Sequence, residues 1–317
     1  MNWTKHGRFF SLSETDSNDW RCSHTQLPIV DDTNPDYWRI YYSSRNKQGM
    51  SLPCTVDIQA GDPNVILGQN IRPLLNLGES GSFDEHGVMP TAIIHLGDTF
   101  YLYYIGWSRR SDVPYQNAIG LAISEDGGDH YIKYHRQPLF DTNAIDPIFT
   151  GTLNILRAGD CWHGYYMSCT EWKQINGQLE PRYRLHYASS ENGLDWLRSG
   201  LVVIDYQNEE EGGIVAASVI AFQQRFHMWF CYRQDRDFRT NKNNSYRIGY
   251  ATSDDAINWL RRDQEAGINI SETGWDSRMI TYPNVIRYRN QLYMFYNGNG
   301  FGQSGIGYAI CNLDQLN

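Results

Sequence analysis

The sequence predicts one all-β domain over residues 1–317, built as a five-bladed β-propeller. Three observations predict it. A strand-and-turn segment recurs along the chain, a strand rich in Tyr and Trp comes ahead of each copy, and another short strand comes ahead of that one. Helical periodicity is weak between these units, and no linker or low-complexity tract marks a second domain.

The recurring segment is an alternating strand that in most copies leads into a polar turn and then a Trp. Successive copies begin roughly 60 residues apart, a spacing typical of propeller repeats. Ser, Asp, Asn and Gly suit the turn because the small polar side chains can bond the backbone. The copies are Ile119–Gly128, Leu185–Trp196, Ile248–Trp259 and Ile306–Ile310.

The other two strand types each occur in five copies, which predicts five meander units. The aromatic strands are Trp38–Tyr42, Phe100–Tyr104, Gly164–Met167, Phe226–Phe230 and Gln291–Tyr296. The strands ahead of them are Leu27–Val30, Met89–Ile94, Leu153–Leu156, Ala217–Ile220 and Tyr282–Ile286. Because few residues follow Ile306–Ile310, we expect roughly residues 7–12 to supply the outermost strand of the last blade.

Composition narrows the function. The net charge of -9 has no basic block, which argues against a nucleic-acid partner. The start of the chain, Met1–Arg8, does not read as a secretory signal, and no stretch reaches membrane-spanning length, so we expect a cytoplasmic protein. Six scattered cysteines without metal-ligand spacing predict neither a disulfide framework nor a zinc site.

Acidic residues precede four of the five first strands at nearly the same spacing. In a propeller these positions share one face with the ends of the second strands, so we expect a ring of carboxylates around the axis. Clustered acids can supply the differently protonated pair that glycoside cleavage needs. The ring consists of Asp84, Asp146, Glu211 and Asp276, while the first blade offers His24.

The same face gathers aromatic, amide and cationic side chains that suit a sugar, since rings stack on pyranose faces and polar groups bond hydroxyls. Arg45, Arg109 and Arg233 would also suit a phosphate or carboxylate on the ligand. His86 matches His24 in the next blade, which leaves a cation in the channel open, but no cofactor is predicted. The further candidates are Glu85, Trp107, Glu171, Trp172, Asn297 and Asn299.

Several motifs carry a family resemblance over nearly the whole chain: Phe83–Pro90, Tyr103–Trp107, Ile119–Ser124, Tyr246–Ala251 and Tyr293–Asn299. With Trp275–Asp276 and Tyr282–Pro283, they resemble the five-bladed arabinanase/levansucrase/invertase superfamily, and more closely glycosyl hydrolase-like proteins of bacterial surface-polysaccharide loci. The resemblance implies a base or nucleophile Asp in the first blade, a second Asp that orients, and a Glu acid. The first blade reads Ser23–Pro28 and has no Asp there.

Two functions remain open. One is a glycoside hydrolase-like enzyme that cleaves or transfers a glycosyl unit, with Asp84 or Glu85 as base or nucleophile and Glu211 or Glu171 as acid. Asp146 is a further candidate for the catalytic set. The other is a non-catalytic sugar-binding propeller that serves bacterial polysaccharide biosynthesis. In both cases the expected partner is a carbohydrate or sugar nucleotide, and the sequence does not set the oligomeric state.

Overall fold

A computed structural model of the protein describes residues 1–12 and 19–315, and within these ranges the chain is all-β. The helical elements there are two short 3₁₀ turns, η1 (Asp263–Glu265) and η2 (Leu313–Gln315). The prediction of an all-β chain is therefore confirmed.

Consecutive strands pair antiparallel as four-stranded meanders. The first contains β2 (Ser23–Asp31), β3 (Tyr37–Arg45), β4 (Ser51–Gln59) and β5 (Asp62–Gln69). The next contains β6 (Gly87–Leu96), β7 (Thr99–Arg109), β8 (Tyr115–Ser124) and β9 (Ile132–Lys133). Then come β10 (Phe149–Ala158), β11 (Cys161–Ile175), β12 (Gln178–Ser190) and β13 (Leu197–Ile204). They are followed by β14 (Glu211–Phe222), β15 (Arg225–Gln234), β16 (Arg247–Ser253) and β17 (Leu260–Arg261).

The last meander is completed from the opposite end of the chain. It contains β18 (Thr281–Tyr288), β19 (Gln291–Asn297) and β20 (Ile306–Asn312), and its outer strand is β1 (Thr4–Phe10), which pairs antiparallel with β20. The predicted closure by the N-terminal segment is confirmed, with the strand beginning three residues earlier than the predicted range 7–12.

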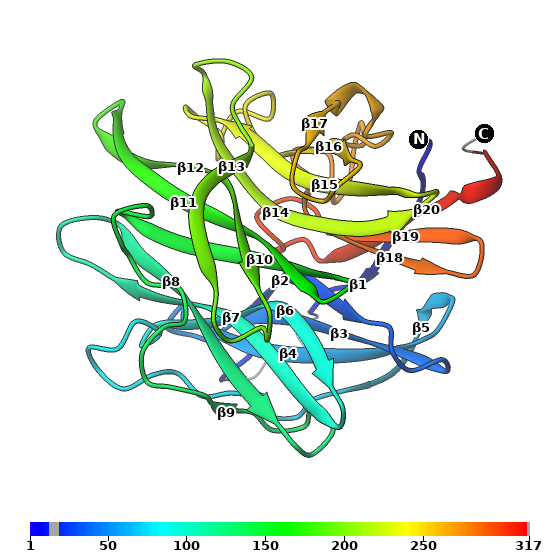
Figure 1. The fold of residues 1–317 in the computed structure, drawn as a ribbon, viewed down its shortest axis with the longest axis horizontal. Coiled ribbons are helices and arrows are strands. Elements are labelled where there is room, and N and C mark those ends of the chain that lie inside the picture. The colour runs from blue at the N-terminus through cyan, green and yellow to red at the C-terminus, as the bar shows by residue number, and fades with distance from the viewer. Residues whose placement is uncertain (13–18, 316–317) are drawn as a thin grey trace.

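The first strands of the meanders gather at a common centre, and the later strands extend outward from it (Figure 1). Each first strand contacts the first strand of the next meander, and β18 contacts β2, so the sheets follow one another around the centre. Single parallel bridges, Ser51 to Gly87 and Tyr183 to Gly213, link neighbouring meanders. Side chains of the first strands and of the ends of the second strands therefore meet near the centre.

Apolar layers fill the spaces between neighbouring meanders. Where the last meander meets the first, Trp38 and Ile40 of β3 pack with Phe295 of β19 and Ile306 of β20. The second strands contribute large aromatic side chains to these layers, such as Trp38, Trp229 and Phe295, which accounts for the Tyr and Trp enrichment of these strands in the sequence. Burying a large apolar side chain contributes about 1.5–3 kcal/mol, so these interfaces hold the sheets together.

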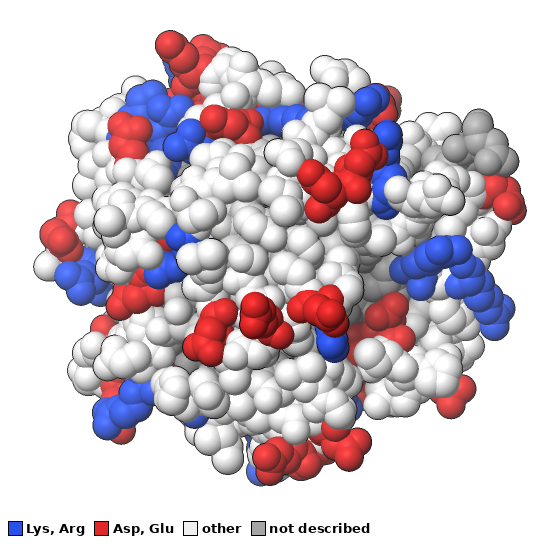
Figure 2. All heavy atoms as spheres, in the orientation of Figure 1, with Lys and Arg blue, Asp and Glu red and all other residues white. Residues whose placement is uncertain are grey.

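Acidic and basic side chains are interspersed on the face shown in Figure 2, without a continuous basic area. No helix in the described part of the chain is long and apolar enough to span a membrane.

Candidate functional site

A cavity of about 550 Å³ lies where the first strands converge. Its walls come from every meander, including Leu27 of β2, Met89 of β6, Thr152 of β10, Val215 of β14 and Tyr282 of β18. A volume in this range accommodates a small ligand and suits a sugar. We call it the axial cavity.

Aromatic rings and hydrogen-bonding side chains share the wall of the axial cavity. Gln26, Asn117 and Thr152 offer amide and hydroxyl groups from three meanders. Such groups bond sugar hydroxyls, while ring faces stack on the apolar face of a pyranose. The rings are those of Trp107, Tyr115, Tyr183, Phe238, Tyr246, Tyr282 and Phe301.

Two glycines create the space for key side chains of this wall. A Cβ on Gly87 would lie 1.6 Å from Nε1 of Trp107, so only glycine allows the indole to cross β6 at this point. A Cβ on Gly213 would lie 2.6 Å from Cε2 of Tyr183 and 2.9 Å from Nε of Arg233. The Tyr183 ring and the Arg233 guanidinium thus occupy space that the side chain of any other residue at position 213 would fill.

The first strands carry bulges in left-handed backbone conformation at the cavity. Leu27 has φ 61° and Tyr282 has φ 55°, and both side chains line the cavity. This conformation costs a non-glycine residue about 1–2 kcal/mol. Hydrogen bonds from the neighbouring meander fix it: the Leu27 N–H donates to Oδ1 of Asn297 at 2.8 Å, and the Tyr282 N–H donates to Sγ of Cys231 at 2.9 Å.

The axial cavity has no Asp or Glu among the described residues that line it. Its charged side chains are Arg45, Arg109, Arg233 and Arg239. Of these, Arg239 forms an ion pair with Glu180, which lies beside the cavity wall. Of the site residues predicted from the sequence, Trp107, Arg45, Arg109 and Arg233 line this cavity.

The predicted ring of carboxylates occupies equivalent places in its meanders, but away from the axial cavity. Asp84 accepts a hydrogen bond from the Tyr104 hydroxyl at 3.0 Å and pairs with Lys133 of β9 at 2.7 Å. Asp146 likewise accepts from Tyr166 at 3.1 Å and pairs with Arg198 at 2.7 Å.

Asp276 repeats this arrangement in the last meander. It accepts from the Tyr296 hydroxyl at 3.1 Å and pairs with Lys5 of β1 at 2.7 Å. Each carboxylate is thus buried between a second-strand tyrosine and a cation on the outermost strand. We call these contacts the outer clamps.

Glu211 forms the remaining outer clamp in a different way. The second strand of its meander has Phe230 near the clamp, and the longer Glu211 side chain instead binds Arg261 of β17 through two hydrogen bonds, of 2.7 and 2.8 Å. The Arg261 guanidinium lies 5.2 Å from the Phe230 ring centre. These carboxylates are buried and paired with cations inside the fold. Their positions therefore do not support a catalytic role for Asp84, Asp146 or Glu211.

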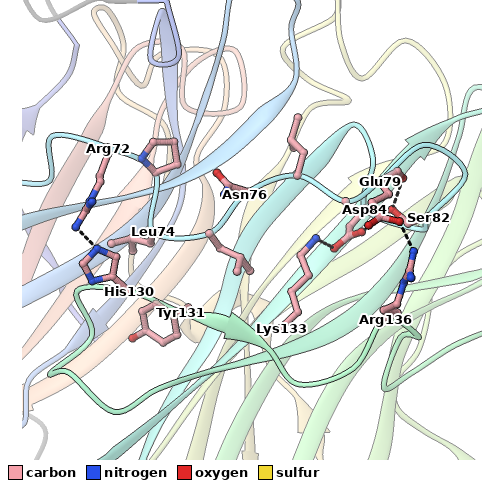
Figure 3. Close-up of a pocket in the computed structure, with 14 residues that line it drawn as sticks. Arg72, Leu74, Asn76, Glu79, Ser82, Asp84, His130, Tyr131, Lys133 and Arg136 are labelled. Carbon is pink, nitrogen blue, oxygen red and sulfur yellow. Dashed lines mark hydrogen bonds and ion pairs between the residues drawn. The ribbon is translucent and has the colours of Figure 1, made fainter.

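Asp84 also borders a second hollow, of about 540 Å³, between residues 72–79 and β9. Figure 3 shows Lys133 reaching Asp84 there, with Arg136 close to Glu79 on the same side. This hollow lies beside the outer strand β9, and its walls come from the connection between β5 and β6 and from residues 130–136. Both of its carboxylates are paired with cations, and Arg72 contacts Nε2 of His130.

The two predicted histidines stand behind the cavity wall. The ring of His86 stacks on Trp107 with centroids 6.0 Å apart, and its Nδ1 accepts the N–H of Arg109 at 3.3 Å. Burial, with a smaller effect of the positive charge of Arg45, lowers the pKa of His24 to about 4. A neutral His24 beside Arg45 adds no positive charge to this side of the site.

The other predicted residues do not line the cavity. Trp172 packs on Tyr115 and Phe149, with centroids 5.5 and 5.7 Å apart. Asn297 is fully buried and holds the backbone of the first strand, as described for Leu27. Asn299 accepts the N–H of Arg278 at 2.8 Å.

Glu85 and Glu171 are acids at the surface of the same region. Glu85 accepts the N–H of Gly81 at 2.9 Å and lies 3.4 Å from Nδ1 of His86. The Glu171 side chain is 53% exposed and lies 3.7 Å from Arg182. Neither lines the axial cavity.

Several cavity residues were missed by the sequence interpretation. Tyr115, Asn117 and Tyr183 lie at or near the beginnings of third strands, opposite the second-strand ends that were considered. Considering the third-strand residues that face the ends of the second strands would have identified all three. In the part of the chain that the structure describes, no group of three or more His, Cys, Asp or Glu side chains could hold a metal ion.

Solved structures of glycosidases share this fold. A putative glycosidase from Bacteroides thetaiotaomicron is 14% identical, with a TM-score of 0.71 over 98% of this chain and 96% of its own. A structure from work on the GH130 family of mannoside phosphorylases has a TM-score of 0.67 at 14% identity, over 99% and 94%. A thermostable family-43 glycoside hydrolase has a TM-score of 0.63 at 15% identity, over 93% and 92%. At these identities the likeness shows the fold alone.

No family model matches the chain. Two relatives from Mycobacterium tuberculosis, the uncharacterized proteins MT1551 and Rv1502, are each 33% identical to it over 310 residues, which is 98% of this chain and 99% of theirs. With identity at this level over the whole length, the chain belongs to the family of these two mycobacterial proteins.

Proposed function

We propose that this protein is a carbohydrate-binding five-bladed propeller that holds a sugar in its axial cavity. The observation that carries the proposal is the wall of that cavity, where aromatic rings alternate with amide and hydroxyl groups from several meanders. Rings supply stacking area and the polar groups select hydroxyl positions. The sugar-binding alternative from the sequence is thereby preferred over hydrolysis.

Paired-carboxylate hydrolysis is the second candidate, and the fold shared with glycosidases favours it. It needs two carboxyl groups roughly 5–9.5 Å apart on either side of the bond to be cleaved. The acids proposed from the sequence, Asp84, Glu85, Asp146, Glu171 and Glu211, do not line the axial cavity. A hydrolase working there would take one of these two groups from Glu180, whose Oε2 is buried without a hydrogen-bond partner and whose Oε1 pairs with Arg239.

The proposed setting is bacterial surface-polysaccharide synthesis in the cytoplasm. It rests on the sequence resemblance to proteins of bacterial surface-polysaccharide loci. A cytoplasmic protein meets activated or lipid-linked sugars more readily than finished polymer, so these are the ligands to test first.

The test combines binding and turnover on one panel of aryl glycosides, methyl glycosides and nucleotide sugars. Calorimetry should show saturable binding that weakens about tenfold or more in Trp107→Ala, because aromatic stacking contributes about 1–3 kcal/mol. Trp162→Ala is the matched control, since this indole is buried away from the cavity.

Turnover separates the two candidates. We expect none by the parent protein. Hydrolysis that falls at least a hundredfold in a folded Glu180→Gln variant would establish an enzyme instead. The same loss in Asp84→Asn or Glu211→Gln would show that the carboxylates of the outer clamps are catalytic.

A further inference from the structure

Three arginines in the axial cavity have no carboxylate partner among the described residues. Arg45 extends from the end of β3, Arg109 from the end of β7 and Arg233 from β15, so the positive charges approach from three different meanders. Within residues 1–12 and 19–315, no ion pair involves any of the three. Elsewhere in the fold, buried cations such as Arg198 and Arg261 are paired with Asp or Glu.

Arg233 is the most buried of the three, with 1% of its surface exposed. Its Nε donates to the hydroxyls of Tyr183 and Tyr246 at 3.2 and 3.3 Å, and its two Nη atoms donate to the carbonyls of Gln234 and Pro181 at 2.9 and 2.8 Å. All of these acceptors are formally neutral. A guanidinium has five N–H donors, so Arg233 retains donors beyond these bonds.

The aromatic ring of Phe238 covers the same guanidinium. Its centre lies 3.8 Å from Cζ of Arg233. The group is thus held in one orientation by stacking and neutral hydrogen bonds, and its charge is not neutralised by the protein. Burying such a charge without a counter-charge is costly, which an anion in the cavity would offset.

Arg45 and Arg109 also make few hydrogen bonds to the protein. Arg45 reaches Oε1 of Gln26 at 3.5 Å, and its buried Nε has no hydrogen-bond partner. Arg109 donates to the carbonyl of Gln48 at 2.8 Å and lies 5.8 Å from the Trp107 ring centre. Both side chains therefore keep most of their donors for a ligand in the cavity.

We propose that the axial cavity binds a sugar carrying a phosphate group, with Arg45, Arg109 and Arg233 around the phosphate and the aromatic rings against the sugar. This deepens the proposed function and rests on it. A carboxylate is satisfied by one guanidinium in a fork-to-fork pair, whereas a phosphate offers three oxygens and a charge near -2 that suit donors from several directions. A sugar phosphate and a nucleotide sugar share this chemistry.

The experiment is calorimetric titration of the full chain with probes that separate charge from sugar. The probes are glucose 1-phosphate, UDP-glucose, glucuronate, methyl glucoside, inorganic phosphate and pyrophosphate. We expect the phosphate-bearing sugars to bind at least tenfold tighter than methyl glucoside and glucuronate, with affinity falling as salt rises.

Arg45→Gln and Arg109→Gln should each weaken the phosphate-bearing probes by about 10- to 100-fold, the effect of losing a charged hydrogen bond of about 1.5–3 kcal/mol. Arg110→Gln is the matched control, because this neighbour is 52% exposed, points to Asp112 and does not line the cavity, so its affinities should equal those of the parent. Both test variants remove partly exposed side chains, and circular dichroism confirms that they fold.

The outcomes separate the two proposals. Equal affinity for neutral and phosphorylated sugars, or no change in both variants, overturns the phosphate site and leaves sugar binding standing. Binding of inorganic phosphate or pyrophosphate that Arg109→Gln abolishes, with no preference for any sugar, upholds the anion site and contradicts the carbohydrate function. Absence of binding by every probe overturns both.

Discussion

Replacing Lys5 by Met should destabilise the fold more than its position near the start of the chain would suggest. Lys5 lies on β1 and pairs with Asp276 at 2.7 Å, with side-chain exposures of 23% and 2%. Removing one partner of a buried pair leaves the other charge uncompensated and costs about 3–5 kcal/mol. Because Asp276 keeps the Tyr296 hydroxyl as a donor, we expect the lower end, about 3 kcal/mol.

This loss can be measured by urea unfolding followed by tryptophan fluorescence and by thermal unfolding. With an unfolding entropy of about 2.1 cal/mol/K per residue, 3 kcal/mol corresponds to a fall in Tm of about 5 °C for this length. Arg225→Met is the control, because Arg225 lies 2.8 Å from Asp254, a similar distance, but the two side chains are 45% and 77% exposed. It should cost less than about 1 kcal/mol.

A double-mutant cycle tests the cause. Asp276→Asn keeps an acceptor for Tyr296 and removes the charge, so the combined variant should lose less than the sum of the single losses, by at least about 1 kcal/mol. Additive losses within about 0.5 kcal/mol would show that the two side chains are not coupled and would refute the reasoning.

Three further predictions concern pH, packing and the clamps. Burial lowers the pKa of His227 to about 4, so at pH 5 the unfolded chain binds a proton there that the folded chain excludes. The free energy of unfolding should therefore fall by about 2 kcal/mol between pH 7 and pH 5 through His227 alone. In urea titrations His227→Phe should reduce the fall by this amount, whereas the exposed His135→Gln should leave it unchanged. Gly87→Ala should displace the Trp107 indole and weaken sugar binding tenfold or more by calorimetry. Asp84→Asn should lower Tm while ligand affinity stays within twofold, and lost affinity in a folded variant would contradict its structural role.

The fold could be predicted because its signal is repeated. The aromatic second strands and the apolar first strands recur in every meander, and all the segments predicted for these two strand types lie in observed strands. The third strand of the first meander, β4, was not identified because Ser51–Gln59 lacks the Ile-Gly-Tyr-Ala pattern of its equivalents. Its register comes from pairing with β3, a tertiary contact that a local pattern does not contain.

The site was predicted less well, for a physical reason. Asp84, Asp146, Glu211 and Asp276 do lie at equivalent positions, as their regular spacing predicts. In each meander, however, the carboxylate at this position pairs with a cation and so serves packing. Their cationic partners lie on the outermost strands, roughly 50 residues later in the chain or, for Asp276, near its beginning. The spacing of the acidic residues along the sequence does not indicate which distant cation each of them contacts.

The pairing of β1 with β20 has a consequence for biosynthesis. A ribosome adds about 5–20 residues per second, so the first strand emerges roughly 15–60 s before its partner exists. During that interval β1 lacks the strand with which it pairs in the folded protein, and its backbone hydrogen-bonding groups are unpaired. Nascent chains should therefore engage chaperones until the last strand is released, and a stop codon placed before Ile306 should yield aggregates even though the earlier meanders are intact.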